Sequence, residues 1–94
     1  MILTGKAKEA FLKRSIGKEI ALFEAMLPIY QHALIIEWLD SVGIYISTEY
    51  IYGDHFSCCV ETLEQTTFTK GDTRQQATEK AIEKANEIYN EKHK

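Results

Sequence analysis

The chain has 94 residues, of which 45% are hydrophobic and 11% aromatic, and its formal net charge is −3. This composition is too apolar for a disordered protein, and the length suits a single domain, 1–94, with one core. No apolar stretch approaches the ~20 residues that a membrane-spanning helix needs, and the N-terminus turns charged at Lys6, which is atypical of a signal peptide. The two cysteines, Cys58 and Cys59, are adjacent, so we expect no disulfide and a reducing cytoplasm.

Charge is distributed unevenly along the chain. Positions 1–18 carry five Lys and Arg residues against one acid, Glu9. Positions 19–69 contain eight acids and no Lys or Arg at all, whereas 70–94 mix both signs. Such asymmetry says nothing about the fold, but it bears on the partners that each part of the surface could attract.

The N-terminal part, 1–42, is predicted to be helical. Thr4 is placed to cap a first helix over 5–14, because a threonine hydroxyl can accept a free N–H group of the first turn. Ser15 and Gly17 follow that helix and indicate a break.

A second helical stretch, 20–27, is apolar almost all round. A helix with no polar face is either deeply buried or part of an interface, and both alternatives stay open here. Pro28 suits the first turn of a third helix over 28–41. Gly43 stands where a helix commonly ends in the left-handed conformation.

Beyond Gly43 the hydrophobic period changes to two, which predicts a three-stranded antiparallel meander over 43–69. A three-residue loop at 53–55 would pair Tyr50 with Cys58 and bring the apolar faces of the first two strands together. By the same reasoning, a loop at 63–65 would pair Val60 with Phe68 in a short third strand.

The last element, a helix over 73–91, has the clearest pattern. Thr73 and Gln76 match a capping box, and a stripe of small residues includes Ala77 and Ala81. The fold class that we predict is therefore α+β, with N-terminal helices, a three-stranded antiparallel meander and a C-terminal helix packed on the sheet.

Asp54, His55, Cys58 and Cys59 are the nearest approach to a metal-ligand cluster. The two cysteines should point to opposite faces of a strand, and the spacing matches no zinc pattern, so we expect neither a metal nor another cofactor. Cys59 is predicted to lie opposite Glu49, an acidic setting that does not favour a reactive thiolate. Without a phosphate-binding loop or hydrolase motif, we expect no catalytic residues and no enzymatic activity.

The outward-facing side of the hairpin is the candidate protein-contact surface. Exposed aromatic and apolar side chains among acids are typical of an interface. The alternative is that the N-terminal helices cover this face and make the sheet two-sided. The candidate residues are Tyr45, Glu49, Ile51, Glu61 and Leu63.

Residues 73–81 resemble the last-helix motif of the double-stranded-RNA-binding domain, whose element order is also helix, three strands, helix. Of the cations that bind phosphate in that family, only Arg74 is present, and Gln75 and Thr78 occupy the other places. Because phosphate contacts supply most non-specific affinity, RNA binding is the alternative function rather than the leading one.

Three segments together resemble small uncharacterised proteins encoded by phages and prophages of Bacteroides-type bacteria. They are 3–11 (LTGKAKEAF), 36–44 (IEWLDSVGI), and 73–77 (TRQQA) with 81–89 (AIEKANEIY). No activity is attached to that family, so the resemblance implies only a phage-related role in the cytoplasm of a bacterial host cell. We therefore expect a non-enzymatic protein that binds another protein, either itself as a homo-oligomer or a host factor that it inhibits or modulates.

Overall fold

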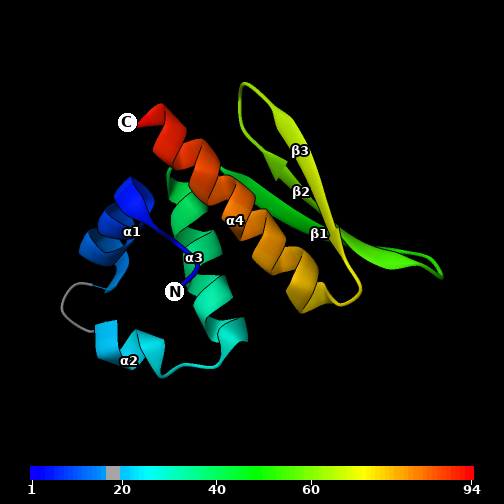
Figure 1. The fold of residues 1–94 in the computed structure, drawn as a ribbon, viewed down its shortest axis with the longest axis horizontal. Coiled ribbons are helices and arrows are strands. Elements are labelled where there is room, and N and C mark those ends of the chain that lie inside the picture. The colour runs from blue at the N-terminus through cyan, green and yellow to red at the C-terminus, as the bar shows by residue number, and fades with distance from the viewer. Residues whose placement is uncertain (17–19) are drawn as a thin grey trace.

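The computed structural model of the chain describes residues 1–16 and 20–94. It is an α+β fold in which N-terminal helices precede a three-stranded antiparallel sheet of order β1-β2-β3, and helix α4 packs against that sheet (Figure 1). None of the described helices has the length and apolar character needed to cross a membrane. The elements are α1 (Gly5–Phe11), the π-helical turn η1 (Leu12–Ile16), α2 (Ile20–Glu24), α3 (Pro28–Ser41), β1 (Tyr45–Ile51), β2 (His55–Glu61), β3 (Thr66–Gly71) and α4 (Arg74–Lys92).

The helices lie on one side of the sheet. Helix α4 contacts all three strands, and α3 lies beside it, against β1 (Figure 1). Helix α1 packs against α4, and α2 against η1, on the side away from the strands. The opposite side of the sheet therefore has no described element over it.

The start of α1 differs from the prediction. Thr4 precedes the helix, but its side chain makes no capping hydrogen bond to it. The Asn90 side chain of α4 does so instead, because its Oδ1 accepts the Ala7 N–H at 2.8 Å. The helical backbone also runs on through η1 to Ile16, past the predicted break at Ser15, and Gly17 lies outside the described residues.

Helix α2 is shorter than the predicted stretch 20–27, whereas α3 agrees with its prediction. In α2 only Phe23 is buried, so the all-round apolar stretch is largely exposed rather than deeply buried. Helix α3 begins at Pro28 and has the predicted bounds. Gly43 has φ of +82°, the left-handed conformation expected after a helix.

Aromatic rings join the helices into one core. Phe11 of α1 lies 5.3 Å from Phe23 of α2 and 5.8 Å from Trp38 of α3, both measured between ring centroids. Trp38 in turn lies 5.2 Å from Tyr89 of α4. These edge-on and tilted contacts are the favoured geometries for aromatic pairs.

The β1–β2 loop has the predicted length of three residues, but it comprises 52–54. Tyr50 consequently lies opposite Phe56, and the predicted pairing with Cys58 is wrong by two positions. The reason is Gly53, whose φ of +73° lets the backbone reverse one residue earlier than predicted. Because side chains alternate with a period of two, the shift leaves the apolar faces of β1 and β2 together.

The β2–β3 register differs by one position from the prediction. Val60 lies opposite Thr67, and Phe68 lies opposite Cys59. A shift of one moves every side chain of β3 to the other face of the sheet. The prediction that Phe68 faces the core with Val60 is therefore wrong, and Phe68 is 69% exposed on the side away from α4.

Thr62 explains that shift. Its hydroxyl oxygen accepts the N–H groups of Glu64 and Gln65 at 3.2 and 3.1 Å, and its own N–H donates to the Gln65 C=O at 2.9 Å. Thr62 therefore belongs to the turn, and the loop has four residues, 62–65, instead of the predicted three.

The start of α4 confirms the predicted cap. The Thr73 hydroxyl oxygen accepts the Gln76 N–H at 3.1 Å. In a capping box the reciprocal bond runs to the capping residue, but here Gln76 Oε1 accepts the Asp72 N–H at 2.9 Å, one residue earlier. Both bonds fix the angle at which the chain passes from β3 into α4.

The small residues of α4 allow close packing, as predicted. Ala77, Ala81 and Ala85 are fully buried against the sheet. The Thr69 hydroxyl donates to the Ala77 C=O at 3.2 Å, and a Cβ added at Gly71 would lie only 2.6 Å from the Ala77 nitrogen. The end of β3 and the first turn of α4 are thus in direct backbone contact.

Candidate protein-contact surface

The side of the sheet away from the helices, here called the outer face, carries the predicted contact residues. Tyr45, Glu49 and Ile51 lie on β1, Glu61 lies on β2, and Leu63 lies in the following loop. All five side chains are exposed, and Leu63 is fully so. The predicted alternative, in which the N-terminal helices cover this face, is not what the structure shows for its described residues.

The outer face has two ends. Tyr45 lies opposite Glu61 at one end, whereas Glu49 lies opposite Ser57 nearer the other. Glu49 lies four positions along β1 from Tyr45, the residue opposite Glu61, and four positions span about 13 Å of strand. The two acids therefore do not form a carboxylate pair of the kind that shares a proton in acid–base catalysis.

Phe68 belongs to this surface, although sequence reasoning placed it in the core. It lies opposite Cys59, which in turn lies opposite Ser47, so an exposed aromatic ring lies on the outer face, midway along β3. The pairing of Cys59 with Ser47 also corrects the prediction that Cys59 lies opposite Glu49. The signal that could have located Phe68 is Thr62, a residue that favours turns by hydrogen-bonding its neighbours.

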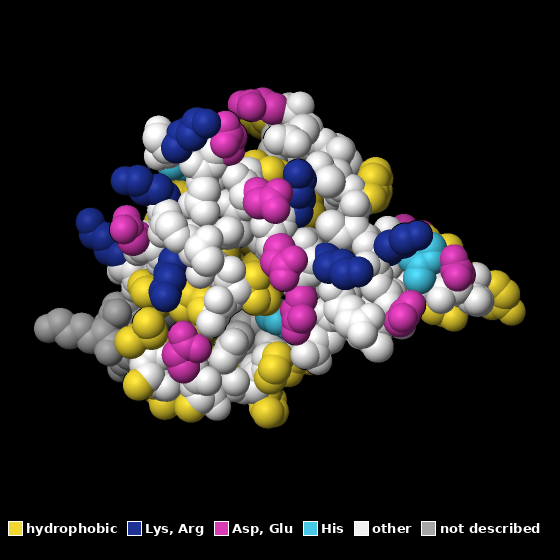
Figure 2. Space-filling model, in the orientation of Figure 1, with side chains coloured by type: hydrophobic (Ala, Val, Ile, Leu, Met, Phe, Trp, Pro, Cys, Tyr) yellow, Lys and Arg dark blue, Asp and Glu magenta, His cyan; other side chains and the backbone are white. Residues whose placement is uncertain are grey.

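The β1–β2 hairpin projects beyond α4 (Figure 1), and hydrophobic side chains lie at its tip (Figure 2). Tyr52, in its loop, is 96% exposed. Behind it, Tyr50 and Phe56 have ring centroids 5.0 Å apart, and the Arg74 guanidinium lies 5.0 Å from the Phe56 ring. This cation–π contact joins the first turn of α4 to the hairpin.

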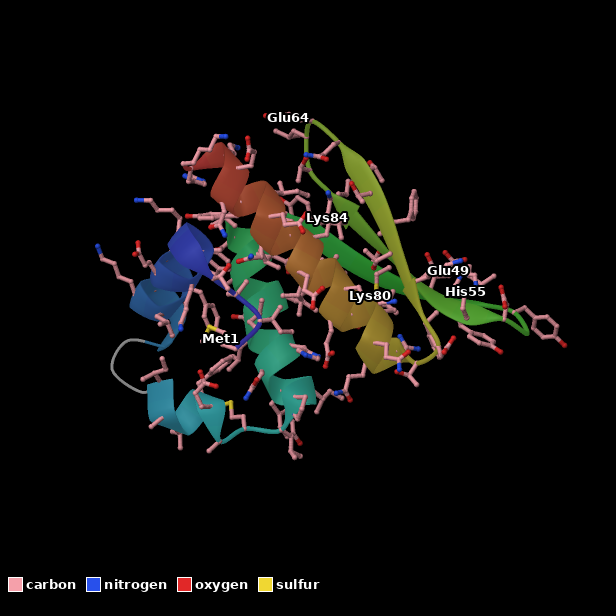
Figure 3. All side chains as sticks on the ribbon, in the orientation of Figure 1. Met1, Glu49, His55, Glu64, Lys80 and Lys84 are labelled. Atoms are coloured by element: carbon pink, nitrogen blue, oxygen red, sulfur yellow. The ribbon has the colours of Figure 1, made fainter. Side chains whose placement is uncertain are left out.

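Acids predominate around the outer face. Glu49 and Glu61 are on the strands, and Glu64 is in the β2–β3 loop; Figure 3 labels Glu49 on the hairpin and Glu64 at that loop. Lys70, near the end of β3, is a cation on this face, because it lies opposite Ser57 in the same row as Glu49. A surface of this composition complements a basic partner.

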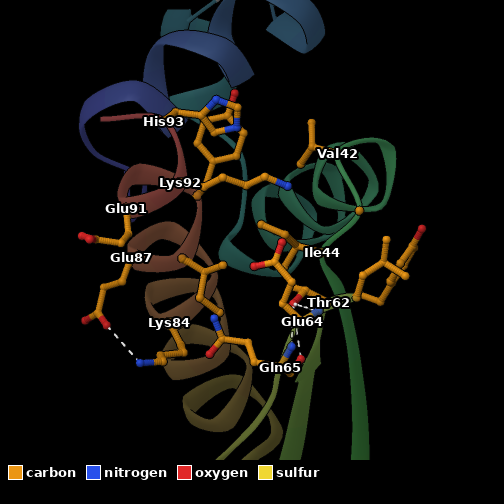
Figure 4. Close-up of a pocket in the computed structure, with 15 residues that line it drawn as sticks. Val42, Ile44, Thr62, Glu64, Gln65, Lys84, Glu87, Glu91, Lys92 and His93 are labelled. Atoms are coloured by element: carbon orange, nitrogen blue, oxygen red, sulfur yellow. Dashed lines mark hydrogen bonds and ion pairs between the residues drawn. The ribbon is translucent and has the colours of Figure 1, made fainter.

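A cavity of about 620 Å³ opens between the C-terminal half of α4 and the β2–β3 loop (Figure 4). Its apolar lining comes from Val42, Ile44 and Ile88, and charged side chains such as Glu64 and Lys84 surround them. Tyr45 and Leu63 line it too, so the cavity is continuous with one end of the outer face. Its volume lies within the range of about 300–1,000 Å³ that is usual for ligand pockets.

The cysteines and His55 are not brought together. Cys58 is buried on the α4 side, where its sulfur lies 3.2 Å from the Thr48 hydroxyl, and Cys59 lies on the outer face. His55 Nδ1 is 2.7 Å from the neighbouring Asp54 carboxylate. Among residues 1–16 and 20–94, no three His, Cys, Asp or Glu side chains gather in a way that could hold a metal ion.

His32 lies where α3 meets α4. Its ring is buried, and its Nε2 is 3.7 Å from Glu79 Oε1. Burial lowers the pKa of His32 below its ordinary value of 6.5, and the nearby Glu79 charge offsets part of that effect. The position between two helices, on the α4 side of the sheet, makes His32 a packing residue.

The three positions compared with the RNA-binding motif have other contacts. Arg74 stacks on Phe56, and Gln75 donates to Glu79 Oε1 at 3.2 Å. Thr78 is buried, so its side chain does not reach a ligand on the surface.

No protein family, no curated protein and no solved structure matches this chain. The function must therefore be inferred from the chain's own residues.

Proposed function

We propose that this protein acts without catalysis, by binding another protein through the outer face of its sheet. One observation carries the proposal: Tyr45, Ile51 and Phe68 are exposed on a sheet face over which no described element packs. Aromatic and aliphatic side chains in such a patch are the usual anchors of a protein interface.

The acids at the border of that patch indicate the character of the partner. Glu49, Glu61 and Glu64 would steer a basic surface toward these apolar side chains and disfavour an acidic surface. A basic host factor, which the protein would inhibit or modulate in the cytoplasm of a bacterial cell, fits both this chemistry and the phage resemblance. A second copy of the chain is a less suitable partner for this face, because like charges would meet.

The test is affinity capture from bacterial lysate with the purified protein and two charge-reversal variants. Glu49→Lys with Glu61→Lys alters the outer face, and Glu37→Lys with Glu83→Lys changes the charge equally on exposed positions of α3 and α4. We expect the first variant to capture at least tenfold less of each specific partner. The second variant should capture as much as the unmodified protein. Equal capture by the protein and the outer-face variant would contradict the proposal.

Phe68→Ala separates the apolar contribution from the charges. The side chain is exposed, so the substitution should leave the thermal unfolding temperature nearly unchanged while weakening partner capture. The native mass of the purified protein reports whether copies associate. A titration with duplex RNA at low and high salt tests the alternative function, which requires binding that weakens steeply with salt.

A further inference from the structure

We propose that the free edge of β3 is a second binding site, which accepts an extended acidic segment of another protein as a fourth strand. This site is distinct from the outer face, since it uses backbone groups at the rim of the sheet rather than side chains on its surface. Its test below is independent of Glu49 and Glu61.

The backbone groups of β3 point alternately toward β2 and away from the sheet. Hydrogen-bonded and non-bonded pairs alternate along an antiparallel ladder. The Thr62 N–H bonds the Gln65 C=O, and counting by twos from that pair assigns Thr67 and Thr69 to bonds with β2. The N–H and C=O groups of the alternate residues, Thr66, Phe68 and Lys70, therefore point away from the sheet.

This edge of the sheet is open. Among residues 1–16 and 20–94, β3 pairs only with β2, as the last strand in the order β1-β2-β3. It has six residues, lacks proline and is rich in threonine, so it favours further strand pairing.

Positive charge lies beside this edge. Lys84 lines the same cavity as Gln65, which immediately precedes β3. Lys80 lies one helical turn before Lys84 on α4. Figure 3 shows both lysines on the side of α4 that faces β3. Lys70 stands on the other side of the edge, among the outer-face residues. Three cations thus flank the open backbone.

The other edge of the sheet lacks this property. Strand β1 lies within 19–69, which has no Lys or Arg, and it carries Glu49. The difference in charge between the two edges selects β3 for an acidic strand.

The spacing of the cations suits a strand. Lys80 and Lys84 are about 6 Å apart along the helix axis, because each residue rises 1.5 Å. Alternate side chains on one face of a strand are about 6.7 Å apart. Two acids at positions i and i+2 of the added strand could therefore each meet one lysine. Lys84 is 3.5 Å from Glu87, but an exposed pair of this kind is weak and leaves the lysine available.

Edge lysines can also serve only to prevent strands from associating, and the experiment distinguishes the two roles. The probe is a synthetic ten-residue peptide of alternating glutamate and valine with blocked ends, and the control peptide has lysine in place of glutamate. We expect the acidic peptide to bind at least tenfold more tightly than the basic one, with an affinity that falls as salt is added. Absence of that preference would overturn the proposal.

Amide hydrogen exchange locates the bound peptide. The N–H groups of Phe68 and Lys70 should become protected in the complex, whereas those of Thr48 and Tyr50, which point outward from β1 by the same alternation, should not. Protection on β1, or none on β3, would show that the peptide binds elsewhere.

Two sets of variants complete the test. Lys80→Glu with Lys84→Glu should weaken binding of the acidic peptide at least tenfold, while Glu49→Lys with Glu61→Lys should not weaken it. Phe68→Pro removes an outward N–H that Phe68→Ala retains, so the proline variant should bind several-fold more weakly than the alanine variant. Circular dichroism confirms that each variant is folded, and equal binding by the proline and alanine variants would exclude strand addition.

Discussion

The Asn90 side chain bonds the backbone of α1, although 83 positions separate it from Ala7. Its Oδ1 accepts the Ala7 N–H at 2.8 Å, and its Nδ2 donates to the Thr4 C=O at 3.0 Å. Asn86, one turn earlier on α4, accepts the Thr4 N–H at 2.9 Å and donates to the Thr4 hydroxyl. The cap of the first helix is therefore supplied by the last helix, and it ties the two ends of the chain together.

Asn90→Ala tests this long-range cap. It should lower the free energy of unfolding by about 1–3 kcal/mol, because the partly buried Ala7 N–H loses its acceptor. Urea denaturation measures the change. Glu83→Ala, at an exposed position of the same helix, is the control and should change stability by less than about 0.5 kcal/mol. A similar loss in both variants would contradict the cap.

Phe23→Ala and Leu22→Ala compare neighbouring residues of α2. Phe23 is 1% exposed and packs on Phe11, whereas Leu22 is 60% exposed. Removal of the buried ring should cost about 3–5 kcal/mol, and truncation of the exposed leucine less than about 0.5 kcal/mol. The comparison uses thermal or urea unfolding. Equal effects would mean that α2 packs on the core through a different side.

Replacement of Gly71 or of Gly43 should lower the free energy of unfolding, for a different reason at each position. Alanine at Gly71 would clash with the Ala77 backbone and lower the free energy of unfolding by about 1–3 kcal/mol. Alanine at Gly43 would lower it by about 1–2 kcal/mol, because the backbone there is left-handed. Asparagine separates the two causes because it tolerates that conformation. Unfolding free energies should therefore recover in Gly43→Asn relative to Gly43→Ala, but not in Gly71→Asn relative to Gly71→Ala.

Burial of His32 should make stability depend on pH. Because its pKa in the folded protein lies below 6.5, both states are neutral above pH 6.5 and the full stability is present. Below pH 6.5 the unfolded chain binds a proton that the native state does not, so stability falls until the pH reaches the folded pKa. The slope from this one group is at most about 1.4 kcal/mol per pH unit.

Urea denaturation between pH 5 and 8 measures that slope, and His32→Asn should remove the part due to this residue. Glu79→Gln provides a check of sign. Since the Glu79 charge raises the pKa of His32, its loss should lower that pKa further and extend the fall in stability to lower pH. A smaller pH dependence in Glu79→Gln would contradict the assigned interaction.

Local patterns were sufficient for much of the fold. The bounds of α3, the left-handed Gly43 and the threonine cap of α4 depend on residues close together in the sequence, and the structure confirms them. The exposed positions of Tyr45, Glu49, Ile51 and Glu61 follow from the two-residue period of β1 and β2, whereas Leu63 is exposed in the loop that follows β2. Their role in binding stays a prediction.

What the sequence determined by itself was the identity and order of these elements and the alternation of faces on β1 and β2. The tertiary structure decided how the elements meet. Because Thr62 is part of the turn, Phe68 faces outward. The pattern of β3 could not indicate this, because both faces of the six-residue strand carry threonine. Asn90 reached α1 only because α4 packs beside it. Both outcomes arise from hydrogen bonds and packing between segments whose proximity exists only in the folded chain.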